Sequence, residues 1–71
     1  MEKEALQKLR EKYVQGTKLK LIQMDDIQAP PVGMTCVVHH VDDSGQIHVR
    51  WESGSSLALI EGVDKFEIVK E

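Results

Sequence analysis

Apolar and polar residues alternate with a period of two in several short runs of the chain, as they do in half-buried β-strands. Residues 41–60 also contain two turn signals, Asp-Asp-Ser-Gly at 42–45 and Glu-Ser-Gly-Ser-Ser at 52–56, and each lies between two such runs. This arrangement is typical of a small antiparallel sheet. We therefore predict five strands, at residues 17–21, 34–41, 46–51, 57–60 and 66–69.

The N-terminal residues follow the helical period instead. Apolar side chains recur close to the i, i+3, i+4 spacing of one helical face, at Ala5, Leu6, Leu9 and Tyr13. This spacing predicts an amphipathic helix within residues 1–14. An isolated helix of this length is marginal in water, so we expect it to dock on the strands or on a second copy of the chain. The second arrangement would make a homodimer.

The connections between the elements complete the fold prediction. Ile22 and Met24 have the opposite parity from the apolar residues before them, which predicts a bulge or a sharp curl. Two prolines exclude a regular element from the long loop at residues 25–33, and residues 61–65 are long enough for one helical turn. The order of elements and the loop lengths predict a mainly β fold. It would be a small five-stranded SH3-like barrel over residues 15–71, preceded by a short N-terminal α-helix.

Composition narrows the choice of partner. The 71 residues include twelve acidic and nine basic side chains, for a net charge of −3, which argues against non-specific binding to nucleic acid or anionic membrane. A protein with a basic surface is easier to accommodate. No apolar run approaches the roughly 20 residues of a membrane span, so we expect a cytoplasmic protein with no membrane contact.

Buried positions offer little chemistry. Trp51 alternates with Ile47 and Val49 and is expected in the core, and the single Cys36 lies within an apolar run, which favours a buried and inert thiol. No serine has an adjacent general base in the sequence. We therefore predict that the protein is not an enzyme and uses no cofactor.

Acidic residues gather in the segments that an SH3-like barrel would place at one rim. The long loop and the turns at 42–45 and 61–65 would surround a shallow groove, with Ile27 and two prolines in its floor and Glu61 beside it. A negative field over apolar surface suits a basic protein partner. Aspartates are also good turn formers, which is the simpler explanation. The predicted partner-binding residues are Asp25, Asp26, Pro30, Pro31, Asp42, Asp43 and Asp64.

The three histidines are candidate metal ligands. Neighbouring strand residues face opposite ways, so His39 and His40 are not expected to share a face, whereas His40 and His48 could meet across the hairpin. Asp42 or Asp43 could add a carboxylate. The spacing matches no specific zinc pattern, and we predict no metal site.

Residues 54–56, Gly-Ser-Ser, could cradle an anion with their amides and hydroxyls, but no lysine follows them and no helix begins there. An ordinary turn with hydroxyl caps is more common. An anion would also need a cation nearby, namely Arg50, Lys18 or Lys20. The residues of this alternative ligand site are His48, Arg50, Gly54, Ser55 and Ser56.

One combination of fragments runs through nearly the whole chain. It comprises GT at 16–17, LIQMDD at 21–26, APP at 29–31, Gly33, VDD at 41–43, GQIHV at 45–49, Trp51, GSSLALI at 54–60, Gly62, Asp64 and Phe66. This combination resembles a bacterial family known only as domain of unknown function 4314. Glu52 and Glu61 depart from it, as does the stretch 34–36. The resemblance supplies no residue roles, and it implies a place on phages and conjugative elements.

The sequence thus predicts a non-enzymatic binding module, a protein-interaction domain of a phage or conjugative-element accessory protein. Two alternatives remain open. One is a protein that sequesters a small anionic ligand or nucleotide. The other is a nucleic-acid accessory protein, against which the negative net charge and the presence of only three aromatic side chains both count.

Overall fold

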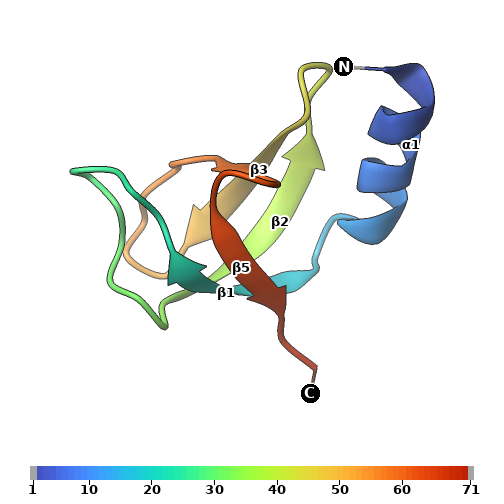
Figure 1. Cartoon of the computed structure of the whole chain (residues 1–71). Coiled ribbons are helices and arrows are strands. Elements are labelled where there is room, and N and C mark those ends of the chain that lie inside the picture. Colours follow the sequence, from blue (N-terminus) through green and yellow to red (C-terminus); the bar gives the residue numbers. More distant parts are fainter. Residues whose placement is uncertain (1, 71) are drawn as a thin grey trace.

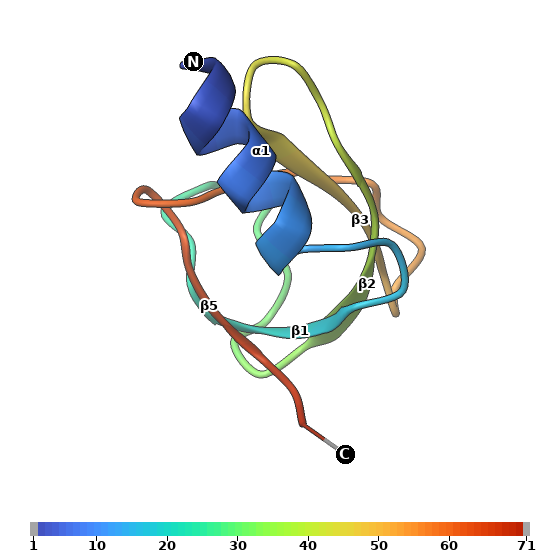
Figure 2. The ribbon, with the colours of Figure 1, turned by 90° about the vertical axis from the view of Figure 1, so that its right-hand side faces the viewer.

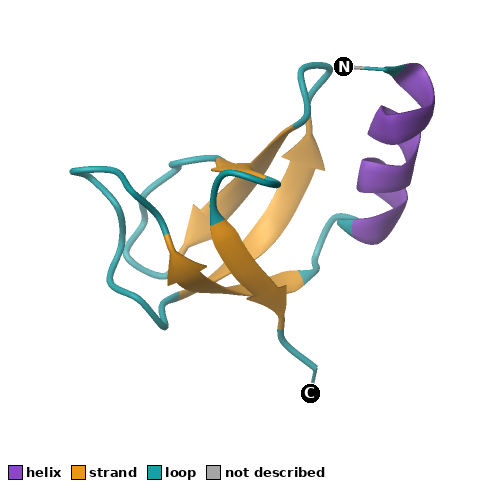
Figure 3. Cartoon of the chain, viewed as in Figure 1, coloured by secondary structure: helices purple, strands orange, loops and turns teal. Residues whose placement is uncertain are grey.

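The computed structural model describes residues 2–70, which form one helix and five strands (Figures 1 and 3). The elements are α1 (Lys3–Lys12), β1 (Lys18–Gln23), β2 (Thr35–Val41), β3 (Gln46–Trp51), β4 (Leu59–Ile60) and β5 (Lys65–Ile68). All neighbouring strands are antiparallel, in the order β4-β3-β2-β1-β5. The mainly β fold with an N-terminal helix is confirmed. The sheet is strongly curled, but β4 and β5 remain its two edges, so it is open (Figure 2).

The strands match their predictions most closely where the alternation is cleanest. β3 has the predicted bounds, whereas β4 is limited to Leu59–Ile60. The expected helical turn at residues 61–65 is wrong, because Glu61 and Asp64 form a β-bridge there. Gly62 takes a φ of 92°, a left-handed value that glycine adopts readily and that a right-handed helical turn does not contain. The Asp64 carboxylate also accepts the Ile60 N–H at 2.9 Å. A non-helical turn therefore leads into β5.

Two bulges interrupt the regular pairing. In β1 the register shifts between Leu21 and Gln23, so the predicted bulge is confirmed at this point. In β2 the register shifts between Val38 and His40, which makes His39 the extra residue. Both His39 and His40 are consequently exposed. The expectation that these two histidines face opposite ways is wrong, because it assumed an unbroken strand.

The core lies on the concave side of the curled sheet. Its most deeply buried side chains are Leu19, Leu21, Cys36, Val38, Ile47, Trp51 and Leu59. The predicted burial of Trp51 is confirmed, and its indole N–H donates to the Leu57 carbonyl at 2.8 Å. Cys36 is also buried, and burial raises the pKa of its thiol to about 11. The protonated thiol is a poor nucleophile, as expected.

The helix α1 docks on the sheet of its own chain (Figure 2). Leu9 and Tyr13 are buried, and the Tyr13 ring lies 5.6 Å from the ring of Phe66 in β5. Arg10 donates to the Val41 carbonyl at 3.2 Å and pairs with Asp43 at 2.8 Å. Docking on the strands is therefore confirmed, and a homodimer through α1 stays a prediction. No helix in residues 2–70 is long and apolar enough to cross a membrane.

Candidate functional site

Three aspartates from distant parts of the chain line one hollow of about 330 Å³. Asp25 and Asp26 follow β1 after Met24, while Asp64 comes just before β5. We call this hollow the acidic groove. Its lining consists of Met24, Asp25, Asp26, Gln46, Leu57, Ala58, Ile60, Val63 and Asp64. No lining residue is basic, so the groove combines negative charge with apolar surface.

Backbone hydrogen bonds hold two of these carboxylates in place. Asp26 accepts the N–H of Gln28 at 2.8 Å, and Asp64 accepts the N–H of Ile60 at 2.9 Å. Each bond fixes one carboxylate oxygen within a turn, as is usual for aspartate. The aspartates therefore shape the loops and also give the groove its charge.

The structure divides the predicted partner-binding residues. Asp25, Asp26 and Asp64 come together, whereas Pro30 and Pro31 do not line the acidic groove. Ile27, expected in the floor, is fully exposed. The apolar lining comes instead from Met24, Leu57, Ala58, Ile60 and Val63. The sequence could not reveal this set, because its members belong to loops and edges whose side-chain directions depend on the turns.

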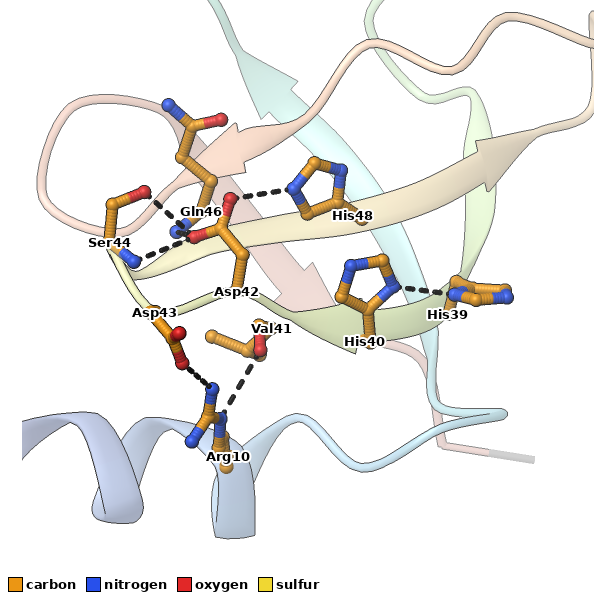
Figure 4. A network of polar contacts seen from close by, with 9 residues as sticks. All are labelled: Arg10, His39, His40, Val41, Asp42, Asp43, Ser44, Gln46 and His48. Carbon is orange, nitrogen blue, oxygen red and sulfur yellow. Dashed lines mark hydrogen bonds and ion pairs between the residues drawn. The ribbon is translucent and has the colours of Figure 1, made fainter.

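The other two predicted aspartates have partners within the chain (Figure 4). Asp42 accepts hydrogen bonds from the Ser44 N–H at 3.0 Å, the Ser44 hydroxyl at 2.8 Å and the Gln46 N–H at 2.9 Å. Its second oxygen lies 2.8 Å from Nε2 of His48. The contact with His48 and these donors hold the pKa of Asp42 well below its usual range. Asp43 pairs with Arg10. Neither Asp42 nor Asp43 lines the acidic groove.

The three histidines form a continuous row on the outer side of the hairpin (Figure 4). His40 and His48 are cross-strand partners, and their rings stack with centroids 4.5 Å apart and an interplanar angle of 7°. Their predicted approach is confirmed. His39 joins the row through an Nδ1-to-Nδ1 distance of 2.6 Å to His40. The polar pair between Val38 and Val41 was the one sequence signal that could have revealed the bulge.

All five residues of the alternative ligand site line a second hollow, of about 250 Å³. We call it the imidazole hollow. Its lining consists of His39, His40, His48, Val49, Arg50, Gly54, Ser55 and Ser56. Lys18 and Lys20, the other candidate cations, lie on β1 and do not line it. In residues 2–70, no group of three or more histidine, cysteine or acidic side chains is placed to hold a metal ion.

Residues 2–69 match the family model described as Domain of unknown function (DUF4314). The chain belongs to this family. No curated protein and no solved structure matches it.

The DUF4314 match spans α1 and all five strands. Both the acidic groove and the imidazole hollow lie within it. They share a border, because Ser56 lines the hollow while Leu57 and Ala58 line the groove. Two sites of opposite charge character therefore flank one short segment of a DUF4314 domain.

Proposed function

We propose that this DUF4314 domain is a non-enzymatic binding module that receives a basic segment of a partner protein in the acidic groove. The observation that carries the proposal is the combination of three carboxylates with exposed apolar side chains in one hollow. Ile60 and Val63, which both line the groove, expose 40% and 73% of their surface. Lysine and arginine match such a surface, because their aliphatic stems pack on apolar groups while their charged ends reach a carboxylate.

The partner would contact side chains rather than extend the sheet. β4 is an edge strand of only two residues, and the Ile60 N–H is already bonded to Asp64. Short edges with occupied amides resist pairing with another strand. The proposed interaction is therefore electrostatic and apolar in character, and it should weaken as salt is added.

The non-enzymatic part of the proposal rests on the serine environments. Ser44 donates its hydroxyl hydrogen to Asp42, and the Ser55 hydroxyl accepts the N–H of Leu57. Within residues 2–70 no serine hydroxyl is hydrogen-bonded to a histidine. A serine nucleophile would need such a base.

The proposal also covers the type of fold and the cellular context of the module. We propose that the curled sheet is an SH3-like barrel over residues 15–71, which its strand order and its long first loop support. We further propose that the module acts in the bacterial cytoplasm for a phage or conjugative element. That context rests on the family resemblance alone.

The test measures binding of short peptides by fluorescence anisotropy. One peptide set has lysine or arginine on both sides of a leucine, and the matched set has glutamate instead. Asp25→Asn with Asp26→Asn should weaken binding of the basic peptides about tenfold, because charged pairs across an interface are lost. Asparagine can still accept the Gln28 N–H, so the turn is retained.

The control variant combines Glu4→Gln with Glu67→Gln, which removes two exposed acids outside the groove. We expect it to bind the basic peptides as the natural sequence does. Equal losses in the two double variants would show that net charge alone attracts the peptide. Absence of saturable binding to the natural sequence would also contradict the proposal.

A further inference from the structure

We propose that the imidazole hollow is a binding site for a small phosphate-type oxyanion, such as inorganic phosphate or the terminal group of a phosphate monoester. Four nitrogen-rich side chains line it, namely His39, His40, His48 and Arg50, and Ser55 and Ser56 add two hydroxyls. No carboxylate belongs to the lining. Clusters of charged and hydroxyl donors are the chemistry that recognises phosphate oxygens.

The fold assembles these donors from two strands and one turn. His48 and Arg50 are two residues apart in β3 and therefore project to the same face. The bulge at His39 brings a second imidazole of β2 to that face beside His40. A regular strand would have supplied only one.

The segment after β3 supplies the rest of the polar lining. Gly54 N–H donates to the Trp51 carbonyl at 2.8 Å, and the Ser55 carbonyl accepts the Trp51 N–H at 3.1 Å. These bonds anchor the segment to the buried end of β3, because Trp51 is part of the core. The two serines are thus held beside the basic side chains.

Hydrogen bonds within the histidine row occupy some of its ring nitrogens. A bond between two Nδ1 atoms needs one N–H and one lone pair, so the Nδ1 atoms of His39 and His40 satisfy each other. Nε2 of His48 lies 2.8 Å from the carboxylate of Asp42, at the far end of the row. The other ring nitrogens of the three histidines are left to meet a ligand, beside the permanent positive charge of Arg50.

Size and competing contacts define the ligand class. The volume of about 250 Å³ is below the roughly 300 to 1,000 Å³ of drug-sized ligand sites, which favours a small anion. For a metal ion, by contrast, no suitably placed group of three or more histidine, cysteine or acidic side chains exists within residues 2–70.

The first experiment titrates the full chain with sodium phosphate at constant ionic strength and follows backbone amide shifts by NMR. We expect saturable shifts confined to residues 39–40, 48–50 and 54–56. A parallel titration uses a nucleoside monophosphate. Saturable shifts at these residues with either compound support the site. The compound that binds more tightly shows whether the ligand is free phosphate or a phosphate monoester. Unsaturated shifts spread over all lysines and arginines would overturn the proposal, as would a response to zinc chloride but to neither phosphate.

Matched variants test the role of charge. Arg50→Gln should weaken phosphate binding about tenfold, because a charge-assisted hydrogen bond is lost. Lys20→Gln removes the same charge from an exposed position on β1 outside the hollow and should bind as the natural sequence does. Equal weakening in both variants would overturn the proposal. The double variant Asp25→Asn with Asp26→Asn should bind phosphate normally, so this test can fail or succeed independently of the acidic groove.

Discussion

At the scale of single residues, Trp51 has the largest structural role. It exposes 1% of its surface and is the largest fully buried side chain in the described part of the chain. Trp51→Ala should lower the free energy of unfolding by about 3 to 5 kcal/mol, because it leaves a cavity and frees the Leu57 carbonyl. Urea unfolding followed by circular dichroism measures this loss.

The control for that substitution is Val32→Ala, at a position that is 72% exposed. It should change the free energy of unfolding by less than about 0.5 kcal/mol. If Trp51→Ala were as stable as this control, the indole would not be packed as the structure shows.

Asp42 determines part of the acid sensitivity of the fold. Its pKa is lower in the folded chain than in the unfolded chain, because His48 and three donors favour the carboxylate. Between the two pKa values the unfolded chain binds more protons, so this contribution is complete above about pH 4 and is lost as the pH falls further. Thermal unfolding from about pH 5 downward should show a steep decrease in stability for the natural sequence and a shallower one for Asp42→Asn.

The adjacent Asp43 supplies the comparison for that measurement. Asp43→Asn removes the same charge but leaves the contacts of Asp42 in place, since Asp43 bonds to Arg10 instead. We expect it to retain the steep acid dependence. A shallow dependence in both variants would mean that the Asp42–His48 contact does not cause the effect.

At the scale of elements, the bulge in β2 predicts that the fold tolerates deletion of its extra residue, His39. Val38 and Val41 are both buried on either side of the two exposed histidines. Deletion of His39 should restore strict alternation and keep Val41 in the core, so the chain should still unfold cooperatively. Deletion of His48, where no extra residue exists, should shift the following residues to the wrong face and abolish cooperative unfolding. Thermal unfolding of the two deletion variants distinguishes these outcomes, and similar behaviour of both would contradict the assigned bulge.

The same two strands show what the sequence reveals and what it leaves out. β3 was predicted with its true bounds, because Ile47, Val49 and Trp51 alternate strictly and a turn signal precedes them. The bulge in β2 was missed, since periodicity assumes that every residue has a cross-strand partner. The bulge in β1 was found, because there the apolar parity itself changes at Ile22.

At the scale of the whole molecule, the aspartates of the sequence separate into two groups. Some of them line the acidic groove, and the others bond to basic side chains elsewhere. Asp25 and Asp64 share the acidic groove because β1 pairs with β5, a long-range contact that composition does not encode. Asp42 and Asp43 belong to the same predicted partner-binding set, but their partners in the structure are a histidine and a helix arginine. The acidic residues of the sequence thus predict that a negative surface exists, and the pairing of the strands determines which of these residues lie on it.

Trp51 also connects both sites to an optical signal. Its backbone N–H is bonded to Ser55, at the imidazole hollow, and its indole N–H is bonded to Leu57, at the acidic groove. It is the single tryptophan of the chain. A ligand that displaces either residue alters the surroundings of this one fluorophore, so intrinsic emission can report occupancy of either site without a label.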